Sequence, residues 1–462
     1  MEPEHIRFGG GASETVLHPL VLVALLVAIT LIFVRPRKYA VVPFLLTALL
    51  VPFGQVVVLG GVHFSVYRIL VLLGLVRLAM TKGASARGRL AGGFNSIDRV
   101  FTYWALLSLI TFSLQWMEIQ ALIKSLGSLL DALGGYFVLR FLIQDREDVQ
   151  RAMRAFAIIA VVLAVCMTNE QLTHENIFGL LGGFPRAAVV LREGKVRSTG
   201  AFEVYITAGV FGATLLPLFV WFWSDAKSRI AASLGMVGAT VMTITSVTNT
   251  PLMAYGAGIV GLCFWPLRKH MRACRWGLVL TLVGLHLVMK GPVWALIARA
   301  DLTGSTSANQ RYMLVDNSIR HFSDWWLLGC KNYNEWGPFM WDTSNQYVKY
   351  ALTGGLVTLV LFIAIISRGY GRLGNARKLV EHNRSEAWFL WCLGTALFSH
   401  VVAYFGISYF DQMQVAWYAL LAIISVAVFE AMQSSVPQVQ KALASSYQAD
   451  AAVNWDALEV NR

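Results

Sequence analysis

The sequence contains little charge for its length. Lys, Arg, Asp and Glu make up 14% of its 462 residues, whereas hydrophobic residues make up 56%. A soluble domain of this size would have too few charged side chains to cover its surface. Apolar stretches of about 20 residues recur, and a helix of that length crosses the roughly 30 Å of bilayer hydrocarbon. Because backbone groups in lipid must be paired within their own segment, the sequence predicts an all-α polytopic membrane protein.

Motifs of soluble enzymes and of metal sites are also lacking. The five cysteines are scattered and form no CxxC pair, which argues against a zinc site or a disulfide framework. The chain has no GxxxxGK[ST], HExxH or GxSxG motif, and no GxGxxG that follows a strand. We therefore expect no metal and no cofactor, and any chemistry must use a substrate carried by the membrane.

About thirteen apolar stretches are long enough to be spans. The first follows an acidic start, is too long for the apolar region of a signal peptide and ends in the basic run RPRK at 35–38. The predicted spans are 16–34, 39–59, 62–80, 98–116, 120–143, 153–167, 202–223, 230–247, 251–267, 276–297, 348–367, 386–406 and 409–430. Residues 1–430 are thus expected to form one transmembrane domain.

The distribution of Lys and Arg predicts the orientation of these spans. With the N-terminus outside, most basic residues fall in segments on the cytoplasmic side, and the polar tail 431–462 is cytoplasmic as well. The formal charge of +12 then reflects topology and contact with anionic lipid headgroups, and no nucleic-acid partner is expected. Two long loops, 168–201 and 298–347, lie outside.

Both outer loops carry arginines against the positive-inside trend. The first contains Arg186, Arg192 and Arg197, the last of them directly before a span in RSTGAF. A boundary arginine that contacts lipid headgroups needs no further explanation. The alternative is a fork of donors for a phosphate group, which suits guanidinium geometry. Glu203, about one turn into the predicted span, is expected to face a polar interior because it would be unfavourable against lipid.

The second outer loop contains SANQRYMLVDNSIRHF at 307–322, with helical spacing from Arg311 onward. Such a segment fits an amphipathic helix on the membrane surface, and a helix of this kind can also cover a site for a lipid-linked ligand. The section 324–342 is rich in aromatic residues, among them Tyr333, Trp336 and Trp341. These residues fit either an interfacial aromatic belt or a platform on which sugars stack. His321, the only histidine in the loop, is a candidate for catalysis.

Ionisable residues within the predicted spans offer a different hypothesis. Lys124 and Asp131 share one face of a predicted helix, and Arg68, His286, His400 and Asp411 are further candidates. Groups of this kind are unfavourable in lipid unless they are paired or hydrated, and they line the proton or ion pathways of transporters. They are scattered over different spans and form no repeated motif, so a transporter ranks lower.

The ordered set of loop motifs resembles the bacterial O-antigen ligase and O-antigen polymerase superfamily. The resemblance covers roughly 190–365 in detail. Its elements are RSTGAF with Arg197, QRYML with Arg311 followed by LLGCKNY with Gly329, and Ser344-Asn345 followed by nine residues and Gly355. Two departures stand out. Ser344 occupies the position of the family's loop histidine, and 245–258 has no counterpart of a further arginine that often follows the mid-chain span.

The resemblance implies a GT-C-type membrane enzyme with about 12–13 transmembrane helices in the bacterial cytoplasmic membrane. Its substrate would be a glycan linked to polyprenyl pyrophosphate, which is transferred to an acceptor hydroxyl during surface or exopolysaccharide assembly. Arg197 and Arg311 would hold the pyrophosphate, assisted by Arg186 and Arg192. Membrane lipids and other polysaccharide-assembly proteins are the implied partners.

In that reading Asp342, Ser344 and Asn345 would position or activate the acceptor. Because an unassisted serine is a poor base, Asp342 or His321 would have to accept the proton, and Asp342 is favoured since it lies in the matching loop. Two alternatives stay open. One is a flippase or other transporter of lipid-linked glycans, and the other is a non-catalytic member of the superfamily that binds the carrier lipid.

Overall fold

The computed structural model describes residues 15–60, 62–81, 90–183, 186–187, 190–192, 194–299, 307–338 and 340–434. Within these ranges the first half of the chain is mainly helical, with one β-hairpin between the second and third helices. Its elements are α1 (Pro19–Val34), α2 (Arg37–Leu50), β1 (Val56–Leu59), β2 (Val62–Ser65), α3 (Val66–Met80), α5 (Ser96–Trp116), α6 (Ile119–Leu129), the π-helix η1 (Leu130–Gly134), α7 (Gly135–Leu142) and α8 (Arg146–Thr173).

The second half contains the remaining long helices and the two loops. The first loop holds η2 (Ile177–Leu181) and a short hairpin of β3 (Leu191–Arg192) and β4 (Lys195–Val196). Then come α9 (Tyr205–Phe222), η3 (Ala226–Ser228), α10 (Arg229–Thr245), α11 (Asn249–Cys263), η4 (Trp265–His270), α12 (Met271–Val288), η5 (Val293–Ala295), α13 (Leu296–Arg299), α14 (Ser307–Arg320), α15 (Phe322–Trp325), η6 (Tyr333–Trp336), α16 (Gln346–Leu379), α17 (Arg384–Ala403) and a final helix, Gln412–Ser434.

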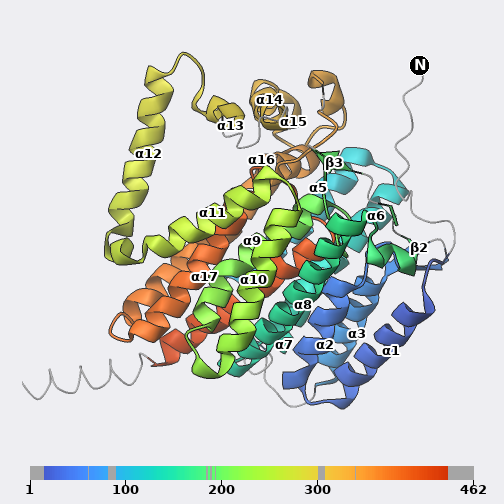
Figure 1. The fold of residues 1–462 in the computed structure, drawn as a ribbon. Helices are drawn as coiled ribbons and strands as arrows, with labels where there is room; N and C mark the ends of the chain where they lie inside the picture. The colour runs from blue at the N-terminus through green and yellow to red at the C-terminus, as the bar shows by residue number, and fades with distance from the viewer. Residues whose placement is uncertain are drawn as a thin grey trace, which may run out of the picture.

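The long helices form one bundle around two inner members. In both α9 and Gln412–Ser434, 83% of the most apolar window is buried, so these helices form the centre. Helix α9 packs against α8, α10, α11 and α17 (Figure 1). Helix α2 packs against α8, α3 packs against α7, and α1 packs on the outer side of α2 and α3. The short helices α13, α14 and α15 lie across the end of the bundle at which α16 begins (Figure 1). We call this the loop end of the bundle.

The prediction of an all-α polytopic membrane protein is confirmed. Eight helical segments of the described chain are long and apolar enough to cross a membrane, and every predicted span overlaps a helix. One predicted boundary is wrong. The range 39–59 is not one helix, because α2 ends at Leu50 and Val56–Leu59 pairs with β2. The β-branched valines, with Pro52 and Gly54 ahead of them, favour a turn and a strand over a continued helix.

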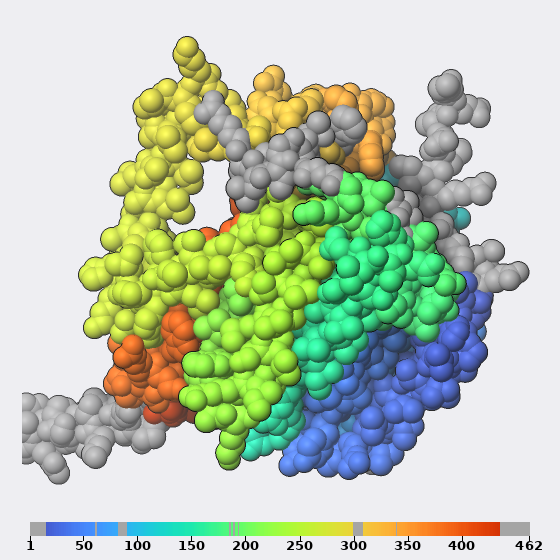
Figure 2. Space-filling model, in the orientation of Figure 1, coloured from blue at the N-terminus to red at the C-terminus, as the bar shows by residue number. Residues whose placement is uncertain are grey.

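Two further boundaries differ from the predictions. Helix α8 runs from Arg146 to Thr173, well beyond 153–167, because its charged first turn is capped by Asp145 and does not need to be apolar. Helix α12 stands apart from the bundle and has no buried residue, and an open space separates it from the rest of the protein (Figure 2). Apart from its first residues, the predicted tail 431–462 lies outside the described residues.

Candidate functional site

The end of the first loop is held against the C-terminal turn of α8 by a buried carboxylate. Glu170 is 2% exposed, and its oxygens accept hydrogen bonds from the backbone N–H groups of Thr199 and Gly200 at 3.0 Å each. Asn176 donates to the carbonyl oxygen of Gly200 at 2.8 Å. Gly200 has φ +59°, a conformation that glycine adopts without strain. The backbone of Thr199 and Gly200 therefore holds the RSTG segment in place, and Arg197 lies two residues before Thr199.

Arg197 lies half-buried beside the first turn of α9. Its Nη1 donates to the hydroxyl of Tyr205 at 2.7 Å, and its guanidinium lies 4.7 Å from the centroid of that ring. Its Nε is buried and has no hydrogen-bond partner among the described residues. A guanidinium held in this way by an aromatic ring keeps donors available for an anionic group.

The other arginines of the first loop are placed differently. Arg186 forms an ion pair with Glu175 at 2.9 Å, and both side chains are more than half exposed. Arg192 is half-buried in β3, opposite Lys195 of β4. The structure thus holds Arg197 at the bundle and leaves Arg186 on the surface. The assisting role predicted for Arg186 and Arg192 stays a prediction.

The second loop docks onto α16 through two glycines. Gly355 has φ +72° and interrupts the helix, so the N–H of Leu356 donates to the carbonyl oxygen of Trp326 at 2.8 Å. The freed carbonyl oxygen of Leu352 accepts from the N–H of Cys330 at 2.9 Å. At Gly329 an added Cβ would lie 2.1 Å from that same oxygen. The two glycines of the resemblance are therefore explained by close packing of backbone on backbone.

The predicted acceptor-side residues lie where α14 meets the start of α16. Asp342 accepts a hydrogen bond from the Ser344 hydroxyl at 2.5 Å through Oδ1, and another from the Gln310 amide at 3.1 Å through Oδ2. Asn345 caps α16, since its Oδ1 accepts from the backbone N–H groups of Tyr347 and Val348. Gln310 directly precedes Arg311, so the structure brings the first turn of α14 to the turn that contains Asp342.

His321 is remote from this turn. It directly follows α14, eleven residues beyond Gln310, which corresponds to roughly 16 Å along a helix. Its ring stacks on Trp336 with centroids 4.6 Å apart, and its Nδ1 lies 3.0 Å from the carbonyl oxygen of Asn317. A structural role explains these contacts, and the geometry favours Asp342 over His321.

The aromatic residues proposed for sugar stacking are placed unequally. His321 covers one face of Trp336, and Tyr333 packs in a small cluster against the same part of the loop. By contrast, Trp341 is 69% exposed. Of the three, Trp341 therefore offers the most accessible ring, directly before Asp342.

Four ionisable side chains from separate parts of the chain influence one another electrostatically near the start of α16. Asp411 has φ +51°, directly before Gln412–Ser434, and lies beside Glu203 in the turn before α9. Lys349, one turn into α16, lies within electrostatic reach of Asp411 and of Lys124 on α6. Burial, helped by the Glu203 carboxyl and opposed by Lys349, raises the pKa of Asp411 to about 8. A carboxyl group with a pKa in this range can take up a proton near neutral pH.

Glu203 and Asp411 belong together although 208 positions separate them in the sequence. Each residue was predicted to lie at or in a span, but no sequence pattern linked the two residues. Glu203 is exposed and precedes α9, so the expectation that it lies one turn inside the span is wrong. Lys349 was not predicted as a site residue, because a single lysine at a helix start is common at membrane surfaces.

Lys124 and Asp131 do not pair with each other. Asp131 accepts three hydrogen bonds of 2.9–3.0 Å from the guanidinium of Arg68, and Arg68 also donates to the carbonyl oxygen of His63. Lys124 lies 5.8 Å from the centroid of the Phe112 ring. The π-helix η1, which contains Asp131, accommodates this ion pair near the β1–β2 hairpin.

The described residues include no group of three or more His, Cys, Asp or Glu side chains that could hold a metal ion. The chain matches no protein-family model and no curated protein sequence, so its resemblance to the O-antigen ligase and polymerase superfamily rests on the residues quoted above.

Proposed function

We propose that this protein is a membrane glycosyltransferase that transfers a glycan from a polyprenyl-pyrophosphate carrier to an acceptor hydroxyl. The reaction would take place at the loop end of the bundle, on the outer face of the bacterial cytoplasmic membrane, in a GT-C-type enzyme. The observation that carries the proposal is that the buried Asp411 lies beside Glu203, just after the first loop, and within electrostatic reach of Lys349 at the start of α16. Arg197 contacts Tyr205, two residues beyond Glu203.

In this mechanism the acceptor oxygen attacks the anomeric carbon of the donor glycan. The bond between that carbon and the pyrophosphate oxygen breaks, and the carrier pyrophosphate leaves with the bonding electrons. Arg197 and Arg311 stabilise the negative charge that develops on the leaving group, and such preorganised donors contribute about 10²–10³ in rate each. The hydroxyl proton goes to a carboxylate of the enzyme.

Two carboxyl groups are candidates for that proton acceptor. Asp342 already accepts hydrogen bonds from Ser344 and Gln310, which suits a residue that positions the acceptor. Asp411 is the better base, because a raised pKa near the working pH gives the strongest general base that is still partly deprotonated. Asp411 would then take the role of the loop histidine of the resembling family, at whose position this chain has Ser344.

The transporter alternative receives less support from the contacts. It relied on Lys124 and Asp131, and the carboxylate of Asp131 is occupied by Arg68. The replacement of the loop histidine by Ser344 favours the other alternative, a non-catalytic protein that binds the carrier lipid, unless a different base is present. A transfer assay separates these possibilities.

The test uses the purified protein in lipid nanodiscs with a polyprenyl-pyrophosphate-linked oligosaccharide and a glycan acceptor. Transfer and release of polyprenyl pyrophosphate are measured together. Arg197→Ala and Arg311→Ala are expected to lose about 10²-fold or more of the activity. Arg320→Ala is the matched control, since Arg320 lies on α14 with a 70% exposed side chain paired to Asp316. Normal transfer in both test variants would overturn the assignment.

A further inference from the structure

A second site lies at the end of the bundle opposite the loops. A cavity of about 180 Å³ opens between the first turn of α8, the turn after α9 and the first turn of α17. Its lining includes the buried Trp221, the half-buried Arg146, Gln150 and Asp225, and the exposed Ser385. Glu170 and Arg146 lie at opposite ends of α8, 24 residues or roughly 36 Å apart. This cavity is therefore independent of the proposed active site.

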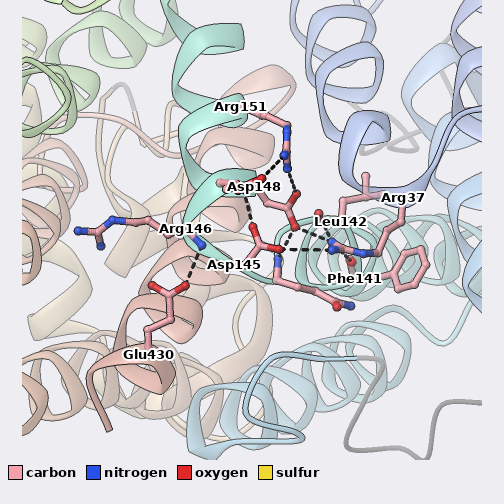
Figure 3. A network of polar contacts seen from close by, with 10 residues as sticks. Arg37, Phe141, Leu142, Asp145, Arg146, Asp148, Arg151 and Glu430 are labelled. Atoms are coloured by element: carbon pink, nitrogen blue, oxygen red, sulfur yellow. Dashed lines mark hydrogen bonds and ion pairs between the residues drawn. The ribbon is translucent and has the colours of Figure 1, made fainter. Parts of the chain in front are cut away.

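Arg146 is the positively charged residue in the lining of the cavity. Its side chain extends away from the ion-pair network of Arg37, Asp148 and Arg151, while its backbone N–H donates to Glu430 at 2.7 Å (Figure 3). The guanidinium packs over aromatic rings, 5.0 Å from the centroid of Trp221 and close to Phe389.

One donor of this guanidinium is engaged and another is not. Nη2 donates to Glu386 at 3.0 Å, whereas Nη1 is buried and has no hydrogen-bond partner among the described residues. A buried charged donor without a partner is unfavourable by several times the value of an ordinary hydrogen bond. An acceptor in the cavity that turns the guanidinium of Arg146 toward itself would remove this penalty.

The charges around the cavity limit the chemistry of its ligand. Three carboxyl groups, Asp225, Glu386 and Glu430, lie on or beside its walls, and the cation that faces them is Arg146. Lys227 and Arg229 follow on η3 and α10 with exposed side chains. A purely anionic ligand would place its charge near three carboxyl groups. A ligand that carries both a phosphate and an ammonium group matches both signs.

The position of the cavity indicates a lipid. Arg146 and Phe222 are end residues of two candidate spans, and Ser385 is the second residue of a third, so the cavity lies where headgroups meet the protein. An apolar stripe begins nearby on α10, where Ile230, Leu234 and Val237 are 52–80% exposed. Acyl chains can follow this stripe while the headgroup occupies the cavity.

We propose that this cavity binds the headgroup of a phosphoethanolamine phospholipid. The phosphate accepts from the guanidinium of Arg146 and from the Ser385 hydroxyl, and the primary ammonium group donates to the carboxylate of Asp225. A quaternary ammonium group cannot donate these hydrogen bonds, and a glycerol headgroup lacks the positive charge. The site therefore selects phosphatidylethanolamine over phosphatidylcholine and phosphatidylglycerol.

Lipid binding to the delipidated full-length protein in detergent tests this proposal. Short-chain phosphatidylethanolamine, phosphatidylcholine and phosphatidylglycerol are titrated separately, and the bound lipid is counted by native mass spectrometry. Phosphatidylethanolamine is expected to bind at least about tenfold more tightly, the factor expected for one charge-assisted hydrogen bond. Glycerophosphoethanolamine and inorganic phosphate are titrated as the soluble ligands. A lipid site predicts weaker but detectable competition by the first and none by the second.

Three variants complete the experiment. Ser385→Phe places a ring at the mouth of the cavity and is expected to lower phosphatidylethanolamine affinity at least about tenfold. Asp225→Asn retains a side-chain oxygen that can cap η3, and it is expected to abolish the preference over phosphatidylcholine. Arg154→Gln, on an exposed position of α8, is the control and should bind as the unmodified protein does. Equal binding of the three lipids, full binding by Ser385→Phe, or competition by phosphate alone would each overturn the proposal.

Discussion

Substituting Gly355 by alanine is expected to detach the second loop from α16. The residue has φ +72° and ψ −176°, a region that non-glycine residues occupy at about 1–3 kcal/mol. An added Cβ would also lie 2.3 Å from the carbonyl oxygen of Leu327. Relief of that contact moves the loop and breaks the hydrogen bonds of Leu356 to Trp326 and of Cys330 to Leu352, each of about 1 kcal/mol. The expected loss of stability is roughly 3–5 kcal/mol in total.

Gly371→Ala provides the control with the opposite sign. It lies on the same helix, has ordinary helical geometry, and an added Cβ would meet no atom within 4 Å. Alanine in a helix interior is more favourable than glycine by roughly 0.5–1 kcal/mol, so this variant should be slightly stabilised. Thermal unfolding in detergent measures both effects, and limited proteolysis reports whether the segment 326–338 is released. An unfolding midpoint and a cleavage pattern in Gly355→Ala that match Gly371→Ala would refute the account of the kink.

Three other predictions concern the site and the core. Tyr205→Phe removes the hydroxyl that orients Arg197 and should lower glycan transfer about tenfold or more, while unfolding is little changed; a reduced midpoint with normal transfer would contradict it. Transfer should fall about tenfold per unit as pH drops below about 8, because the deprotonated form of Asp411 accepts the proton, and Asp411→Asn should lower the rate and flatten the profile. Asp98→Asn leaves the fully buried charge of Arg140 without its partner and should destabilise the protein by about 3–5 kcal/mol in thermal unfolding.

The helices were predictable from the sequence because the membrane imposes a simple requirement. Each span needs about 20 apolar residues, and that requirement is local. It fails at 56–59, where a valine run is as hydrophobic as a span but forms a strand, since hydropathy alone does not distinguish the two. Likewise, the motif glycines Gly329 and Gly355 were visible as residues, whereas the backbone contact that requires them joins two segments and could not be derived from either one.

The ion pair of Asp131 shows the same limit of sequence-based prediction for the candidate site. Helical spacing put Asp131 and Lys124 on one face, yet the carboxylate pairs with Arg68 from another helix, through three hydrogen bonds that desolvated charges strongly favour. In the same way, Asp411 lies beside Glu203, which precedes a different helix. Ionisable groups in a low-dielectric environment interact most strongly with the charges nearest to them in space. Periodicity along one helix predicts only which residues are neighbours on that helix. In the proposed glycosyltransferase, a serine at position 344 where the resembling family has a histidine therefore does not by itself remove a base, because the proton acceptor can come from an element that no local motif includes.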